Sequence, residues 1–67
     1  MDIRKRLGAN IRRLRLEKGL SQEEYAFEAG VHRTYVSDIE RGGRNPTATV
    51  IEKLAKPFGI APGRLLD

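Results

Sequence analysis

The side chains of this sequence that could do chemistry are mainly cationic. There are 13 Lys and Arg residues against 9 Asp and Glu, which gives a formal net charge of +4. Much of the positive charge precedes Gly19, and the residues are Arg4, Lys5, Arg6, Arg12, Arg13, Arg15 and Lys18. Such a cluster favours a polyanionic partner, but a solvated helix face explains a charge of this size equally well. Charge alone permits a polyanion partner without identifying one.

Residue types that carry catalysis or bind metals are scarce. The sequence has no Cys and a single His, His32, which excludes disulfides and thiolate metal sites. No glycine-rich phosphate loop follows a strand pattern, no carboxylates cluster at metal-ligand spacing, and Gly42-Gly43 is typical of a helix end. We therefore expect no enzymatic activity, no cofactor and no bound metal.

Length and hydropathy set further bounds. A chain of 67 residues has room for one domain, residues 1–67, with a modest core. No apolar run approaches the roughly 20 residues that span a bilayer, and the N-terminus lacks the apolar segment of a signal peptide. We expect no membrane insertion and a cytoplasmic location, which also suits a chain without cysteine.

The first half of the chain predicts three helices. Between residues 3 and 18, Ile3, Leu7, Ile11 and Leu14 recur at helical spacing, and Gly19 then ends the helix. Ser21 and Glu24 fit a capping box, and Leu20 with Tyr25 fits the flanking hydrophobic staple. This second helix runs to Ala29, because Gly30 breaks it, and a third begins after Val31.

The second half predicts a loop and a fourth helix. Residues 41–46 collect glycine, asparagine and proline, and Thr47 is a suitable N-cap for a helix extending to Phe58. Pro57 should distort that helix's last turn or end it early, because proline lacks the amide donor. Ala61-Pro62 could open a last helical turn, whose apolar neighbours close the core or meet a partner chain: Ile60, Leu65 and Leu66. The fold class is all-α, a compact bundle of four to five helices.

Four residues around the second and third helices fit a helix-turn-helix. Ala26 allows two helices to approach closely, Gly30 adopts the turn conformation that a side chain would oppose, and Val36 with Ile39 packs the second helix of the pair onto the first. Each residue alone is ordinary helix filler. Together with the Ser21 cap and the basic flanks they form a specific pattern.

These motifs resemble a known family. The matching segments are Ser21-Gln22-Glu23-Glu24-Tyr25-Ala26, Ala29-Gly30-Val31, Tyr35-Val36-Ser37-Asp38-Ile39-Glu40-Arg41-Gly42 and Arg44-Asn45-Pro46. They are similar to the bacterial and phage Xre family of Cro and lambda-repressor-like DNA-binding domains, over essentially the whole chain. The segments 33–37 and 39–41 are especially similar to controller proteins of restriction-modification systems.

The resemblance implies a five-helix bundle whose third helix, about residues 33–41, lies in the major groove of duplex DNA. Arg33 is then the first choice for base recognition, because a guanidinium can donate two hydrogen bonds to guanine O6 and N7. Thr34 could add a methyl or hydroxyl contact, and Ser37 lies on the same face. Asp38 could accept from cytosine N4, exclude wrong sites, or simply be a solvated acid.

A second group of residues is expected to contact phosphates. The resemblance places Gln22 in the first turn of the second helix, where side chain and free amides meet a phosphate. Similar positions belong to Tyr35, Ser37, Arg41, Arg44 and Asn45. Tyr35 could equally lay its ring on the core.

Two further expectations concern Glu40 and His32. The resemblance pairs Glu40 with an arginine of the first helix, and Arg15 holds the matching position. The family usually has Ser, Thr or Asp where His32 stands, and histidine is a poor N-cap. His32 could therefore trade helix stability for a base or phosphate contact, or be an exposed bystander.

The expected partners are double-stranded DNA and a second copy of the chain. One module buries limited area on DNA, so we expect a homodimer on an inverted repeat, joined through Phe58, Ile60, Leu65 and Leu66. The alternative is an antitoxin or accessory module of the same fold whose main partner is a protein. A polar and basic recognition face favours DNA over that alternative.

Overall fold

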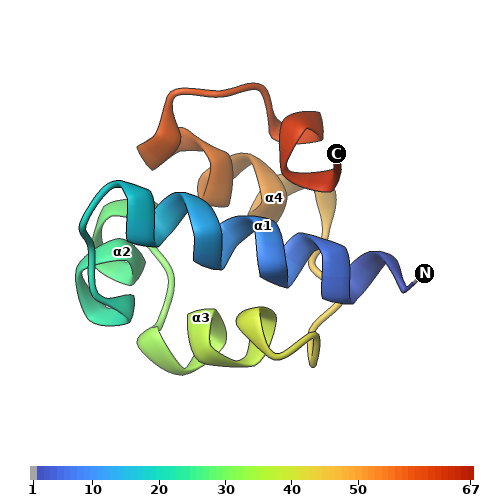
Figure 1. Ribbon diagram of the computed structural model, residues 1–67, viewed down its shortest axis with the longest axis horizontal. Helices are drawn as coiled ribbons and strands as arrows, with labels where there is room; N and C mark the ends of the chain where they lie inside the picture. Colours follow the sequence, from blue (N-terminus) through green and yellow to red (C-terminus); the bar gives the residue numbers. More distant parts are fainter. Residues whose placement is uncertain (1) are drawn as a thin grey trace.

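The computed structural model describes residues 2–67 and confirms an all-α fold. Its elements are α1 (Ile3–Glu17), α2 (Gln22–Ala29), α3 (Arg33–Glu40), α4 (Ala48–Ala55) and the 3₁₀ helices η1 (Lys56–Phe58) and η2 (Pro62–Leu66). α1 crosses the middle of the molecule, with α3 along one side and α4 and η2 along the other (Figure 1). α1 therefore lies between α3 and the C-terminal segment.

The predicted start of α2 is confirmed in detail. Ser21 is the N-cap: its hydroxyl accepts from the Glu24 amide at 3.0 Å, and its own amide donates to the Glu24 carboxylate at 2.8 Å. The bond donated by the Ser21 amide holds the pKa of Glu24 below its usual value, because it favours the charged carboxylate. A reciprocal capping box satisfies two amides that the helix itself leaves unpaired.

Gly30 makes the turn between α2 and α3 possible. It ends α2 with φ of 74°, a left-handed conformation that side chains oppose. The Val31 amide then donates to the Ala26 carbonyl at 3.0 Å. The chain reverses within three residues, as the sequence pattern predicts.

Pro57 has the predicted effect on α4. Thr47 caps the helix, which ends at Ala55, and the chain continues as the 3₁₀ turn η1 with Pro57 inside it. The expected last helical turn after Ala61 is also present, as η2.

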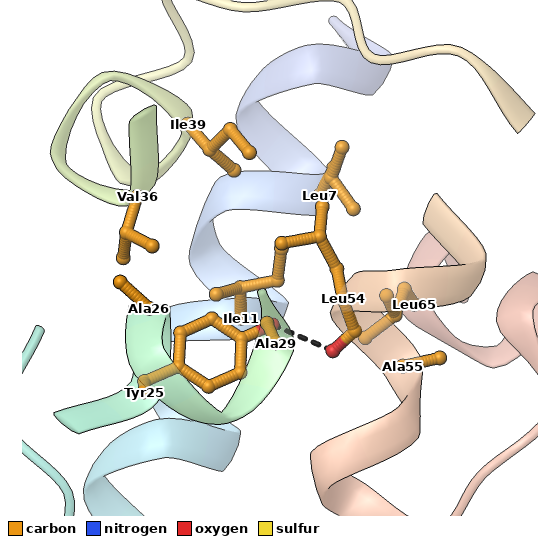
Figure 2. Packing of buried hydrophobic residues seen from close by; sticks show 10 residues of the cluster. All are labelled: Leu7, Ile11, Tyr25, Ala26, Ala29, Val36, Ile39, Leu54, Ala55 and Leu65. Carbon is orange, nitrogen blue, oxygen red and sulfur yellow. Dashed lines mark hydrogen bonds between the residues drawn. The ribbon is translucent and has the colours of Figure 1, made fainter. Parts of the chain in front are cut away.

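The core joins all four α-helices and the C-terminal segment. Its largest fully buried side chains, each less than 2% exposed, are Ile11, Val36, Ile39, Leu54, Leu65 and Tyr25. Figure 2 shows Tyr25 among them, with its hydroxyl donating to the Leu54 carbonyl at 2.6 Å. Its ring stacks on Phe58 with centroids 5.0 Å apart. Tyr25 thus ties α2 to the end of α4 by both its apolar ring and its polar tip.

The contact between α1 and α3 depends on Gly8. A Cβ built there would overlap the Ile39 carbonyl oxygen and lie 3.0 Å from the Glu40 carbonyl oxygen. Both obstacles are backbone atoms, which cannot rotate away. Gly8 therefore sets how closely α1 approaches the end of α3, and the sequence pattern did not single it out.

Candidate nucleic-acid interface

The predicted ion pair between Arg15 and Glu40 is present and buried. Arg15 Nε donates to Glu40 Oε2 at 2.7 Å and Nη2 donates to Oε1 at 3.0 Å, and the two side chains are 7% and 3% exposed. The third nitrogen, Nη1, donates to the Leu20 carbonyl at 2.8 Å. The hydrogen bonds that Arg15 donates to the Glu40 carboxylate raise the pKa of Arg15 above its usual value.

Gln22 joins this pair from the first turn of α2. Its amide nitrogen donates to Glu40 Oε1 at 3.1 Å, and the residue is half-buried. We call Arg15, Gln22 and Glu40 the Glu40 network. It links α1, α2 and α3, so Gln22 has a structural partner in addition to the phosphate contact predicted for it.

α3 presents a polar face outward. Val36 and Ile39 pack into the core, whereas Arg33 and Thr34 lie exposed in its first turn. The Arg33 side chain is 66% exposed, and its Nη1 lies 3.9 Å from Oε2 of Glu23. The Arg33 guanidinium is therefore held only loosely by its neighbours.

Asp38 organises the C-terminal half of this face. Its Oδ2 accepts from Arg44 Nε at 3.2 Å and Nη2 at 3.1 Å, and its Oδ1 accepts from Arg41. Asp38 is thus neither a free solvated acid nor an isolated base acceptor. We call Asp38, Arg41 and Arg44 the Asp38 cluster.

Ser37 and Tyr35 contact the arginines of the Asp38 cluster. The Ser37 hydroxyl accepts from Arg41 Nη1 at 2.9 Å, and the guanidinium of Arg44 lies 4.9 Å from the centre of the Tyr35 ring. This geometry is a cation–π contact. Tyr35 is half-buried and Asn45, in the following loop, is exposed. The structure thus brings together most of the residues predicted to contact phosphates.

The expectation that His32 would be a poor N-cap is wrong. His32 is the N-cap of α3, and its Nδ1 accepts from the Thr34 amide at 3.1 Å. The acceptor nitrogen of a neutral imidazole does here what the oxygen of Ser or Asp does elsewhere. His32 therefore stabilises the start of the helix that carries Arg33, instead of trading that stability away.

One residue predicted for the dimer interface belongs to the core. Leu65 is completely buried within a single chain, so it has no surface to offer a second copy. The amide of Asn10 donates to its carbonyl at 2.8 Å and fastens η2 to α1. Phe58, Ile60 and Leu66 are only half-buried and keep exposed apolar area.

Comparison with known proteins decides the family. A model of the helix-turn-helix family HTH_3 matches residues 11–65. The chain belongs to this family. Control protein C.BamHI of Bacillus amyloliquefaciens is 51% identical over 67 residues, covering 98% of this chain and 83% of the relative.

Solved structures of the family have the same fold. The restriction-modification controller C.AhdI of Aeromonas hydrophila superposes with a TM-score of 0.87 at 45% identity, over 92% of this chain and 94% of that one. SinR in complex with DNA gives a TM-score of 0.85 at 39% identity, over 91% and 98%. The chain is a helix-turn-helix DNA-binding transcriptional regulator, and these relatives are control proteins and regulators rather than enzymes.

Lys18 makes contacts that the sequence analysis did not predict. Lys18 donates to the Pro57 carbonyl and to the Glu28 carboxylate, the latter at 3.2 Å, and so fastens the end of α1 to α2 and η1. The only indication of these contacts in the sequence is the position of Lys18 beside Gly19, at the end of a helix.

In residues 2–67 no helix is long and apolar enough to cross a membrane.

Proposed function

We propose that this regulator recognises a specific duplex sequence by inserting α3 into the major groove. The observation that carries the proposal is the division of α3 into two faces. Its inner face is fixed by Val36 and Ile39 in the core, and its outer face presents Arg33 and Thr34 to solvent. A rigid helix with an exposed polar face positions side chains against base edges.

Arg33 would carry most of the base discrimination. Its guanidinium is largely exposed and weakly paired, so moving it to guanine O6 and N7 costs few existing contacts. Thr34 and Ser37 would add shorter contacts on either side. His32 caps α3 through Nδ1, which leaves Nε2 as the ring nitrogen able to donate to a base or phosphate.

Phosphate contacts would fix the position of α3 on the duplex. Arg41 and Arg44 follow α3, with Tyr35 and Asn45 near them, and Gln22 lies at the N-terminus of α2, where the helix dipole favours an anion. Such contacts supply affinity without base discrimination.

The regulator would bind as a homodimer on an inverted repeat. Phe58, Ile60 and Leu66 keep exposed apolar area in the C-terminal segment, on the side of α1 opposite α3 (Figure 1). A dimer joined there would leave both copies of α3 free for half-sites about one helical turn apart. Such a protein would act in the cytoplasm, at the nucleoid.

The stoichiometry has a direct test. Sedimentation of the chain across a range of concentrations, alone and with DNA, should show two copies per duplex. A single copy on DNA under every condition would exclude the dimer.

Sequence recognition is tested by selection from a random duplex pool, followed by titration of the selected duplex and a scrambled duplex. Arg33→Ala should lower affinity for the selected duplex by roughly 1–3 kcal/mol, about 5- to 150-fold, with little change on the scrambled one. The matched control is Arg64→Ala, which removes the same charge from η2, on the opposite side of α1. Equal losses for both variants on both duplexes would show that α3 does not read bases.

A second candidate role, binding a protein, is favoured by Phe27. Its side chain is 87% exposed on α2, and it lines a shallow hollow with Leu20, Glu23, Glu24 and Glu28. An apolar side chain among three carboxylates suits a cationic protein segment with an apolar side chain of its own. This surface would act alongside DNA binding.

An amphipathic peptide of leucine and lysine tests that candidate by NMR. Shifts centred on the hollow that vanish in Phe27→Gln, and are absent with a matching leucine–glutamate peptide, would support it. Shifts spread over the surface, or unchanged in Phe27→Gln, would exclude it.

A further inference from the structure

The Asp38 cluster holds two of the proposed DNA-contacting cations in one arrangement. Asp38 accepts two hydrogen bonds from Arg44 and one from Arg41, and Ser37 accepts a further bond from Arg41. The Tyr35 ring lies against the Arg44 guanidinium. The side chains of Arg41 and Arg44 are nevertheless 69% and 48% exposed, so they remain accessible to DNA.

The backbone after α3 is shaped to make this arrangement. Gly42 has φ of 78°, and the amides of Gly42 and Gly43 donate back to the carbonyls of Ile39 at 2.9 Å and Asp38 at 2.8 Å. The chain therefore turns back over the end of α3. This turn brings Arg44 to a carboxylate six positions earlier, beyond the three or four residues over which helical side chains meet.

We propose that Asp38 is a specificity-determining residue that acts by holding Arg41 and Arg44 in the geometry of one docking pose. The proposal rests on DNA recognition through α3. Asp38 is acidic on a face that binds a polyanion, so its charge by itself opposes binding. Its contribution is instead to restrict where two cations can go.

The restriction affects random and selected DNA differently. Binding to random duplex depends on phosphate neutralisation, and flexible arginines can follow phosphates in many poses. Arginines that Asp38 already holds bind random duplex less tightly. They must break their hydrogen bonds with Asp38 to reach phosphates in arbitrary positions. In the pose that places Arg33 on its bases, the held geometry is already suitable, and little ordering remains to be done.

The experiment compares the unmodified chain, Asp38→Asn and Glu52→Gln on two duplexes. Glu52→Gln is the matched control, because it removes one negative charge from an exposed position of α4. The duplexes are the one selected from the random pool and its scrambled counterpart, each titrated at several salt concentrations. Circular dichroism establishes that each variant is folded.

The expected result is a loss of discrimination. Asp38→Asn should bind the scrambled duplex about tenfold more tightly, and its logarithmic salt slope should steepen by about 0.9 for each arginine released onto a phosphate. Affinity for the selected duplex should change less than threefold. Glu52→Gln should strengthen binding to both duplexes by the same small factor.

Two results would overturn the proposal. If Asp38→Asn strengthens binding to both duplexes equally, as Glu52→Gln does, Asp38 acts only through its net charge. If it weakens binding to both equally, Asp38 supports the affinity of the two arginines without affecting specificity. Arg33→Ala on the same duplexes reports separately whether α3 reads bases, so a failure of the proposed function is distinguishable.

A second background tests whether Asp38 acts through its two arginines. In a chain carrying Arg41→Gln and Arg44→Gln, no guanidinium of the cluster remains for Asp38 to hold. Adding Asp38→Asn to that chain should then leave the ratio of the two affinities unchanged. A loss of discrimination that persists there would show that Asp38 acts without its arginines.

Discussion

The regulator contains two carboxylate–guanidinium assemblies that differ mainly in burial. In the Glu40 network both charged side chains are at most 7% exposed, and the bonds join three helices. In the Asp38 cluster the carboxylate is 23% exposed and the arginines are much more so, and the bonds stay within α3 and the loop after it. The same chemistry therefore holds three helices together in one place and holds the arginines proposed to contact DNA in another.

The difference in burial determines how much free energy is lost when each assembly is broken. A buried charge that loses its partner stays desolvated and uncompensated, which costs about 3–5 kcal/mol. An exposed pair gains little over solvation by water, and losing it costs about 0–1 kcal/mol. The Glu40 network should therefore control stability, and the Asp38 cluster should control DNA binding.

Removing the Glu40 carboxylate should have the largest effect on stability. Glu40→Ala leaves Arg15 buried without its anion, so the free energy of unfolding should fall by about 3–5 kcal/mol. Urea denaturation followed by circular dichroism measures this. Asp38→Ala is the control in the exposed cluster and should cost less than about 1 kcal/mol. Equal losses for the two variants would remove the distinction between the assemblies.

Gly8→Ala tests whether the Glu40 network depends on close helix approach. The new methyl group would meet the Ile39 and Glu40 carbonyls, so α1 and α3 must separate, and stability should fall by about 1–3 kcal/mol. In an unobstructed helix the same substitution stabilises by up to about 1 kcal/mol. Gly63→Ala, where a Cβ meets nothing within 4 Å, is the control in η2. A Gly8→Ala variant as stable as the parent would show that the contact between the helices is not tight.

The buried Tyr25 hydroxyl should make the stability of the fold depend on pH. Burial, and secondarily the negative charge of Glu40, raise the pKa of the Tyr25 hydroxyl well above its usual value of about 10. The folded state thus keeps a proton that the unfolded state releases, so stability should fall as pH rises above about 10. Tyr25→Phe should weaken this pH dependence.

At neutral pH, Tyr25→Phe should cost about 1 kcal/mol, because the Leu54 carbonyl loses its donor. Urea titrations of both proteins at pH 8, 9, 10 and 11 provide the measurement. Parallel losses in the two proteins across this range would show that other groups cause the alkaline dependence.

Features set by neighbouring residues could be predicted from the sequence. The Ser21 capping box, the turn at Gly30 and the effect of Pro57 depend on backbone chemistry within a few positions, and all three are present. The Arg15–Glu40 pair, 25 positions apart, was expected only because a family resemblance implied it.

Features set by tertiary geometry were missed. Apolar periodicity cannot distinguish a residue buried within one chain from one buried between two, which is why the predicted dimer interface wrongly includes Leu65. Residue type suggested that His32 is a poor cap, although its ring nitrogen reaches the required amide. The contact of Asp38 with Arg44 depends on a loop that turns back at Gly42.

Arg44→Gln should have the smallest effect on stability and yet a clear effect on binding. The side chain is half exposed and its partners are Asp38 and the Tyr35 ring, so the free energy of unfolding should change by about 0–1 kcal/mol. Its loss would remove one of the proposed phosphate contacts, so the logarithmic salt slope should become shallower by about 0.9 on the selected duplex. Arg64→Gln, which breaks an exposed pair with Asp67, is the control and should leave that slope unchanged. If Arg44→Gln destabilises the fold as strongly as Glu40→Ala, the exposed cluster is structural, and burial does not separate the roles of the two assemblies.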